Sequence, residues 1–328
     1  MEVFQAVLTS IYSLLYIVSL LSNCTVILTI LIKKNKKTSN SINPLILNMT
    51  ISDLIFLLLS TFDAITFHKK RWIFGNTFCI IQAFTIETNY TTSITTLTLI
   101  SFERYIVICK PFSKFTFLAL GKPIRFLILI WTLSTILQIP ITFAYRVENG
   151  ICTNSKWGKW PRFTIYSIYT VSFFVIPALV ISVSHFLIIK YLYKNNKIIS
   201  TISYHAGSIS NNSVLTIQQR KINRKRDENK KLTRTLLILS ISFFLSWTPF
   251  VSIRMLKYAN ITIHPYIWPT SQIILIINTA VNPFLYGLSN NPYSNVISII
   301  RSFLQSRIHL FHTGLDDTRQ RLSLNPRL

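Results

Sequence analysis

The stretch that decides the fold runs from Cys79 to Pro111, and it ends in Phe102-Glu103-Arg104-Tyr105-Ile106-Val107-Ile108-Cys109-Lys110-Pro111. About thirty mostly uncharged residues, rich in Thr, Ile and Leu, make up this stretch, and only Glu87 interrupts them before the Glu-Arg pair. At about 1.5 Å per residue, such a helix crosses a hydrocarbon layer of ~30 Å with a tilt. A carboxylate and a guanidinium side by side in a membrane helix are costly unless paired or used. The stretch therefore predicts a central transmembrane helix with a polar, functional end.

The composition places the whole chain in the membrane class. Half of the 328 residues are hydrophobic and only 13% are charged, whereas a soluble protein carries about 25% charge. The formal net charge of +24 is compatible in principle with a nucleic-acid partner. The basic residues lie in short segments between apolar runs, however, and this distribution argues against nucleic acid.

Seven apolar runs predict an all-α membrane protein, a bundle of seven transmembrane helices. The runs cover residues 7–32, 42–67, 79–111, 126–145, 163–193, 232–255 and 266–288. We therefore expect an extracellular segment 1–6, a transmembrane domain 7–290 with a partly disordered, basic loop at about 194–230, and a cytoplasmic tail 306–328. Apolar residues at helical spacing within 291–305 predict a short amphipathic helix in the membrane interface.

The distribution of basic residues predicts the orientation. If the N-terminus is extracellular, 25 of the 34 Lys and Arg residues lie on the inner side and nine on the outer side, as the positive-inside rule requires. We therefore expect a multi-pass protein of the plasma membrane. Cys79 and Cys152 then both face an oxidising compartment and are candidates for one disulfide, which would stabilise the fold by ~4 kcal/mol.

The motifs on these runs, taken together, resemble those of the rhodopsin-like G-protein-coupled receptors. The landmarks are Asn23, Asp53, Glu103-Arg104-Tyr105, Trp131, Pro177, Trp247-Thr248-Pro249 and Asn282-Pro283-Phe284-Leu285-Tyr286. The resemblance implies a receptor and not an enzyme, with an extracellular ligand and a heterotrimeric G protein as partners. Arrestin, a receptor kinase and membrane lipid are further expected partners.

The resemblance also implies the residues of activation. These are Glu103, Arg104, Tyr105, Trp247, Pro249, Asn282, Pro283, Tyr286 and a packing triad of Pro177, Ile94 and Phe243. Pro249 removes a backbone hydrogen bond and kinks its helix, so a rearrangement at the triad could move the inner half of that helix outward. Arg104 would then meet the G protein.

A mid-membrane carboxylate is costly and needs partners, and Asp53 has Ser93, Asn278 and Asn282 available on other runs. The resemblance implies an allosteric Na⁺ bound among these four residues. A hydrated hydrogen-bond network without metal is the alternative. No covalent cofactor is expected.

The chain departs from the family pattern at two positions. Asn229, preceded by Glu228, stands where many relatives carry an acid that holds Arg104, which predicts elevated basal signalling. His185 stands where relatives have a tyrosine, which puts a water-bridged contact with Tyr286 in doubt; a hydrogen-bonded packing role for His185 is the simpler interpretation.

The absence of residues that retinal and amine ligands require restricts the class of ligand. Residues 102–112 look most like animal opsins, yet Ile276 occupies the retinal-lysine position and Gln82 that of the counterion, so a covalent opsin is excluded. An opsin-derived receptor with a non-covalent chromophore or none is an alternative. Ile86 replaces the acid of amine receptors, and Glu87 is rotated about 100° from it, which disfavours a monoamine.

The expected cavity wall is aromatic, with Arg254 as its cation. It comprises Gln82, Ile86, Glu87, Tyr90, Tyr169, Trp247, Phe250, Arg254 and Gln272. The nine outer basic residues would steer anions. We therefore expect a short acidic or amidated peptide, or a carboxylate-bearing small molecule, anchored by Arg254. Alternatively, these cations lie near lipid headgroups and select no ligand.

Two other classes fit the sequence less well. A membrane enzyme needs paired carboxylates, a Ser-His-Asp set or a histidine cluster within the spans, and the six histidines are scattered. A transporter usually shows internal symmetry and broken helices, which the sequence does not display.

Overall fold

The computed structural model describes residues 2–33, 43–110, 123–206, 213–259, 261–264 and 266–289. Its helices are α1 (Glu2–Lys33), α2 (Asn43–Lys69), α3 (Gly75–Cys109), α4 (Pro123–Thr142), α5 (Lys159–Thr170), the π-turn η1 (Val171–Val175), α6 (Ile176–Ala206), α7 (Ser213–Tyr258) and α8 (Ile267–Ser289). The strands are β1 (Arg146–Glu148) and β2 (Ile151–Thr153). The compact unit described below is Met1–Tyr286.

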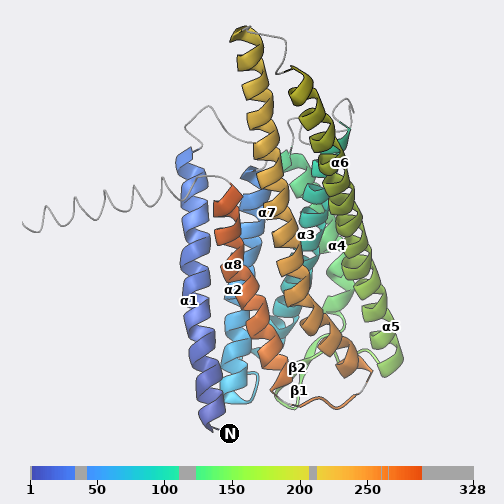
Figure 1. Ribbon diagram of the computed structural model, residues 1–328. Helices are drawn as coiled ribbons and strands as arrows, with labels where there is room; N and C mark the ends of the chain where they lie inside the picture. The colour runs from blue at the N-terminus through green and yellow to red at the C-terminus, as the bar shows by residue number, and fades with distance from the viewer. Residues whose placement is uncertain are drawn as a thin grey trace, which may run out of the picture. The chain divides into compact units, whose positions relative to one another are not determined.

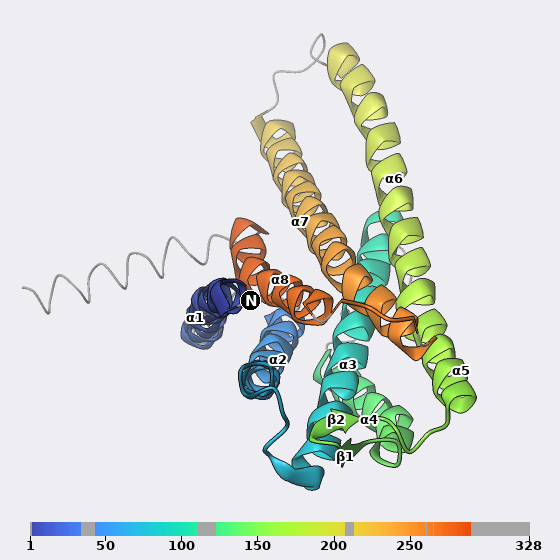
Figure 2. The same cartoon turned by 90° about the horizontal axis from the view of Figure 1, so that it is seen from below.

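Within the described residues, seven membrane-length helices form an all-α bundle, which confirms the predicted fold class. Helices α5 and α6 are continuous through η1 and together make the fifth span (Figures 1 and 2). Five spans are long and apolar enough to cross a membrane by composition alone: Gln5–Leu31, Pro44–Lys69, Pro123–Thr142, Lys159–Lys194 and Thr233–Tyr258. Helices α3 and α8 complete the bundle and carry many of its buried polar residues.

Helix α3 is the central element, and it lies against α2, α4, α6 and α7. Its middle turns carry small hydroxyl side chains, among them Thr92, Ser93 and Thr96, all of which are buried. Small residues let helix backbones approach closely in a membrane. The Thr96 hydroxyl bonds the Thr92 carbonyl of its own helix (2.7 Å), so Thr96 adds no unsatisfied donor to the interface.

Three side-chain hydrogen bonds join neighbouring helices at or beside two family landmarks, Asn23 and Trp131. Asn23 of α1 donates to the Thr279 carbonyl of α8 (3.0 Å). Trp131 of α4 donates to the Asn48 amide oxygen of α2 (2.8 Å), and the Asn48 amide nitrogen donates to Thr96 of α3 (3.0 Å). Each bond satisfies a polar group that would otherwise be costly in hydrocarbon.

A β-hairpin marks one end of the bundle. Strands β1 and β2 pair antiparallel through Asn149-Gly150, both with positive φ (50° and 72°), as a two-residue hairpin turn requires. The Cys79–Cys152 disulfide is present and ties β2 to α3 (Cα–Cα 5.5 Å), so the predicted bridge is confirmed. This end is called the hairpin end below, and the opposite end of α3 is called the Arg104 end.

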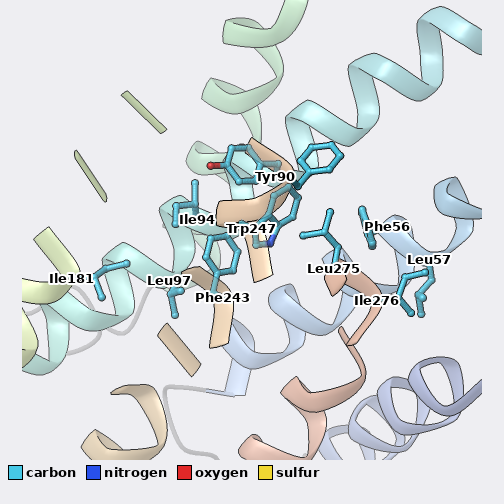
Figure 3. Packing of buried hydrophobic residues seen from close by; sticks show 11 residues of the cluster. Phe56, Leu57, Tyr90, Ile94, Leu97, Ile181, Phe243, Trp247, Leu275 and Ile276 are labelled. Atoms are coloured by element: carbon cyan, nitrogen blue, oxygen red, sulfur yellow. The ribbon is translucent and has the colours of Figure 1, made fainter. Parts of the chain in front are cut away.

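The apolar core lies midway between these ends, where α2, α3, α6, α7 and α8 meet (Figure 3). Ile94 and Ile276 are fully buried in it, and Leu57, Leu97 and Phe243 are nearly so. Figure 3 shows Trp247 between Tyr90 and Phe243, so the central helix and α7 share an aromatic contact.

The helices are longer than their apolar runs. Helix α1 begins at Glu2, not at residue 7, and α6 and α7 extend to Ala206 and from Ser213, so most of the predicted loop at 194–230 is helical. Lys, Arg, Gln and Glu are good helix formers, and elongating an existing helix is easier than nucleating one. Polarity indicated where the membrane ends, but it did not indicate where the helices end. The predicted helix 291–305 and the tail 306–328 lie outside the described residues.

Candidate functional site

A polar cavity lies in the middle of the bundle and contains the four residues predicted to hold sodium. The Asn282 amide of α8 donates to an Asp53 carboxylate oxygen (3.1 Å), and Ser242 of α7 donates to the Asn278 amide oxygen (3.1 Å). The cavity has a volume of about 20 Å³ and is lined by Met49, Asp53, Phe56, Asn89, Ser93, Phe243, Trp247, Leu275, Asn278, Thr279 and Asn282. That volume accommodates about one water-sized particle.

The donor set fits a small hard cation. Carboxylate, amide and hydroxyl oxygens converge here from α2, α3 and α8, and hard cations prefer oxygen ligands. The Asn89 amide nitrogen donates to the Ser52 carbonyl (2.9 Å), but its amide oxygen is buried without a hydrogen-bond partner. Sequence reasoning missed Asn89, although an asparagine near the middle of the run 79–111 was the available signal.

An aromatic stack covers the side of this cavity that faces the hairpin end. The Trp247 ring lies 4.4 Å from Tyr90 and 5.6 Å from Phe243, centroid to centroid. The Tyr90 hydroxyl donates to the Phe173 carbonyl in η1 (2.9 Å). Of the predicted packing triad, Ile94 and Phe243 belong to the same core, and Pro177 is buried on α6.

A buried ion pair joins α3 to α7 beyond the aromatic stack. The Arg254 guanidinium contacts a Glu87 carboxylate oxygen at 2.5 Å, with 4% and 8% of the two residues exposed. The guanidinium also lies over the rings of Tyr166 (5.2 Å) and Phe250 (5.8 Å). Arg254 was predicted as a free cation for an anionic ligand. That interpretation is corrected here, because Glu87 already neutralises the guanidinium.

The two predicted glutamines meet at a residue that sequence reasoning missed. Gln272 of α8 donates to an Asp63 carboxylate oxygen of α2 (3.0 Å). Gln82 of α3 lies close to the same carboxylate and donates to the Leu59 carbonyl (3.1 Å). A second acid in the apolar run 42–67 was the signal that could have drawn attention to Asp63.

The predicted cavity wall therefore divides into two groups. Glu87, Tyr90, Phe250 and Arg254 surround the ion pair between α3 and α7, whereas Gln82 and Gln272 surround Asp63 between α2, α3 and α8. The Tyr169 hydroxyl donates to the Leu137 carbonyl of α4 (2.9 Å), which removes it from the group of free ligand-binding hydroxyls. Ile86 is partly buried.

At the Arg104 end, Glu103 is almost completely buried, and the Arg104 Nε atom is buried without a hydrogen-bond partner. Tyr105 stacks near Phe102 (6.3 Å). His185 is buried within hydrogen-bonding distance of Ser240 (3.2 Å) and Ser101 (3.5 Å), as its predicted packing role requires. The side chains of Tyr286, Glu228 and Asn229 lie outside the described residues.

Charges at the hairpin end are unevenly compensated. Arg146 and Glu148 form an exposed ion pair (3.2 Å). A hydrogen bond from Ser155 and, secondarily, the charge of Arg146 lower the pKa of Glu148. Arg162 of α5 lies over Tyr258 (5.5 Å), and Lys257 of α7 lies over Trp268 (5.0 Å). Among the described residues, neither of these two cations has an acidic partner within 4 Å.

The sequence matches the family described as "7 transmembrane receptor (rhodopsin family)" over residues 22–286. The chain belongs to this family. The match covers most of the bundle, including the polar cavity, the aromatic stack and the Glu87–Arg254 pair. It places the protein with receptors and not with enzymes, as the resemblance implied.

Named relatives of this receptor include both light receptors and peptide receptors. It is 26% identical to "Rhodopsin, GQ-coupled" of Mizuhopecten yessoensis over 86% of the chain and 56% of that protein. It is 24% identical to "Neuropeptide Y receptor type 6" of Oryctolagus cuniculus, over 88% and 78%. It is 27% identical to "Somatostatin receptor type 4" of Rattus norvegicus, over 86% and 69%. The receptor thus spans little more than half the length of the rhodopsin.

Proposed function

We propose that this receptor binds an extracellular ligand at its hairpin end and activates a heterotrimeric G protein at its Arg104 end. The observation that carries this proposal is one face of α7. Phe243, Trp247, Phe250 and Arg254 fall within an arc of about 60° at 100° per residue. Trp247 lines the polar cavity, and Arg254 holds the ion pair with α3.

This face gives a ligand a direct mechanical connection to the helix that must move. A ligand that displaces Arg254 or Phe250 changes the packing of Trp247, because the Trp247 and Phe250 rings are in contact (5.9 Å between centroids). Pro249 lies between Trp247 and Phe250 in α7, and it cannot donate a backbone hydrogen bond. Ligand and G protein then favour the same conformation, and each raises the affinity of the receptor for the other.

A short peptide is the ligand class that the observations favour. One of the named relatives is a receptor for a neuropeptide, and another is a somatostatin receptor. An anionic group of the ligand, such as a carboxylate, fits Arg162 and Lys257 at the hairpin end better than Arg254, whose charge Glu87 neutralises. The aromatic rings beneath those two cations, Tyr258 and Trp268, offer adjoining apolar surface.

An opsin-derived receptor without a covalent chromophore is the second candidate. A rhodopsin and melanopsins are among the named relatives. Ile276 is fully buried within the apolar core, so an apolar side chain fills the position expected for the retinal lysine. Addition of retinal to the purified receptor without a shifted absorbance band, together with activation by a peptide, would favour the peptide class.

We also propose how the receptor is oriented in the membrane and that its polar cavity binds Na⁺. The hairpin end carries the disulfide, which persists in an oxidising compartment, and this supports an extracellular N-terminus at the plasma membrane.

The polar cavity would hold Na⁺ through Asp53, Asn89, Ser93, Asn278 and Asn282. When bound, Na⁺ would compensate the Asp53 charge in the resting conformation. Arrestin and a receptor kinase are proposed as further partners.

Nucleotide exchange tests the proposed function. The receptor is reconstituted in nanodiscs with a panel of purified heterotrimeric G proteins, and exchange is measured alone and with pools of synthetic amidated peptides. We expect exchange above that of empty nanodiscs with at least one heterotrimer, and its loss in Arg104→Ala. Arg125→Ala, which removes an exposed cation of α4 on the same side, is the matched control and should retain exchange. Exchange equal to that of empty nanodiscs under every condition would refute the proposal.

A further inference from the structure

The carboxylates of Asp63 on α2 and Glu87 on α3 lie in the half of the bundle nearer the hairpin end, and their surroundings differ in kind. Glu87 is buried against the Arg254 guanidinium. Asp63 accepts a hydrogen bond from the neutral amide of Gln272, and Gln82 lies close by. Among the described residues, no Lys, Arg or His lies within 4 Å of the Asp63 carboxylate. Asp63 is therefore the carboxylate in this region whose charge the described residues do not balance.

Side chains from three helices form the surroundings of Asp63. Asp63 itself lies on α2, Gln82 lies on α3 and Gln272 lies on α8. Tyr12 of α1 bonds Ser60 (2.9 Å), one turn before Asp63. An ionised carboxylate has about four acceptor sites, so the Gln272 amide leaves capacity for further donors.

Asp63 is also more exposed than Glu87. Glu87 and Arg254 are buried, whereas Asp63 and Gln272 both keep part of their surface exposed. On α2, Asp63 lies six residues before the helix ends at Lys69, which is about 9 Å along the axis. A charged group that binds Asp63 thus need not break the Glu87–Arg254 pair.

We propose that Asp63, with Gln82 and Gln272, binds a cationic group of the ligand, a guanidinium or an ammonium. An opposite charge would supply the compensation that two neutral amides do not, because a charge-assisted hydrogen bond is roughly twice as strong as a neutral one. The proposal rests on ligand entry from the hairpin end. It adds that a peptide ligand carries a basic group toward α2, in addition to any acidic group toward Arg162 and Lys257.

Reaction of an introduced cysteine with charged reagents tests this proposal without a known ligand. The background replaces Cys24 and Cys109 by Ala, and Gln272→Cys places a reporter beside Asp63. Intact cells are treated with a cationic or an anionic methanethiosulfonate reagent of similar size. We expect the cationic reagent to react faster by about tenfold or more, given the interaction of unit charges at a few ångströms. Asp63→Asn in the same background should abolish most of that preference.

Phe67→Cys provides a second reporter, because it lies one turn beyond Asp63 on the same helix and does not alter the hydrogen-bonded glutamines. Glu148→Gln is the charge-matched control, and it should leave the preference intact. A preference that Asp63→Asn does not change, or reagents that fail to reach both reporters from outside, would overturn the proposal. These rates do not depend on G-protein coupling, so they separate its failure from that of the proposed function.

Discussion

The two ends of the α3–α7 contact are held differently. Toward the hairpin end, the buried Glu87–Arg254 ion pair joins the two helices directly. At the other end, Arg104 has a buried Nε atom without a hydrogen-bond partner, and no ion pair joins Arg104 to any α7 residue whose side chain the structure describes. Between them lie the stacked rings of Tyr90, Trp247 and Phe243.

This difference indicates where the resting conformation is stabilised. Removing one partner of a buried ion pair leaves an uncompensated charge in a low dielectric and costs about 3–5 kcal/mol. A closed contact of that size on the ligand side would place control of α7 with the ligand. The predictions below alter one end while leaving the other unchanged.

The largest effect is expected from the disulfide that holds the hairpin end together. Cys79→Ser or Cys152→Ser opens a loop across 73 residues, and the loss of ~4 kcal/mol should abolish surface expression. Flow cytometry of a tagged receptor on intact cells measures this. Cys24→Ser, which removes a free and exposed cysteine, is the control. Normal surface levels of both bridge variants would contradict the structural role of the disulfide.

Loss of the Arg254 charge is expected to have the next largest effect. Arg254→Gln leaves the Glu87 carboxylate buried without its cation, at a cost of about 3–5 kcal/mol, and frees α7 from α3. We expect a lower unfolding temperature and raised basal nucleotide exchange in the receptor that still folds. Lys257→Gln, on the same helix but exposed, should change neither quantity. Equal effects of the two substitutions would show that the Glu87–Arg254 pair contributes no more to stability or to low basal exchange than an exposed cation of the same helix.

A smaller, conditional effect is expected at the polar cavity. A cation that binds only the folded receptor raises its stability by mass action. The unfolding temperature should therefore be higher in sodium chloride than in choline chloride, and Asp53→Asn should remove this difference. Asp63→Asn removes the other acid of α2 and should preserve the sodium response. Sodium dependence that survives in Asp53→Asn would favour the hydrated network without metal.

The smallest effect is expected at the exposed Arg146–Glu148 pair. The pKa of Glu148 is lowered in the folded receptor, so its contribution to stability is present above the ordinary glutamate pKa of about 4.3 and fades as the pH falls through the lower folded value. Solvent screens exposed pairs. Glu148→Gln should leave the unfolding temperature at pH 7 unchanged within error, and a clear drop would show that the hairpin depends on this pair.

The sequence was sufficient for the features that a bilayer imposes. Hydropathy located the seven spans, because hydrocarbon admits only apolar, internally bonded segments. The positions of Cys79 and Cys152 beside those spans indicated their bridge. Helix length was underestimated at 194–230, where polar helix formers continue beyond the membrane.

The pairing of charges could not be derived in the same way. Glu87 and Arg254 lie 167 residues apart, and periodicity does not fix the rotation of one helix against another, so Arg254 was treated as a free cation. Asp63 was overlooked because Gln272, which bonds it, and the nearby Gln82 lie on two other helices. Sequence reasoning assigned both glutamines to the wall of a ligand cavity but did not connect them with Asp63.

Charge reversal across the α3–α7 contact tests the central claim most directly. Unfolding temperature and basal exchange are measured for Glu87→Arg, Arg254→Glu and the double variant that carries both. The account predicts that each single variant is strongly destabilised and that the double variant recovers most of the stability and the low basal exchange of the parent. A double variant whose losses equal the sum of the two single losses would contradict it.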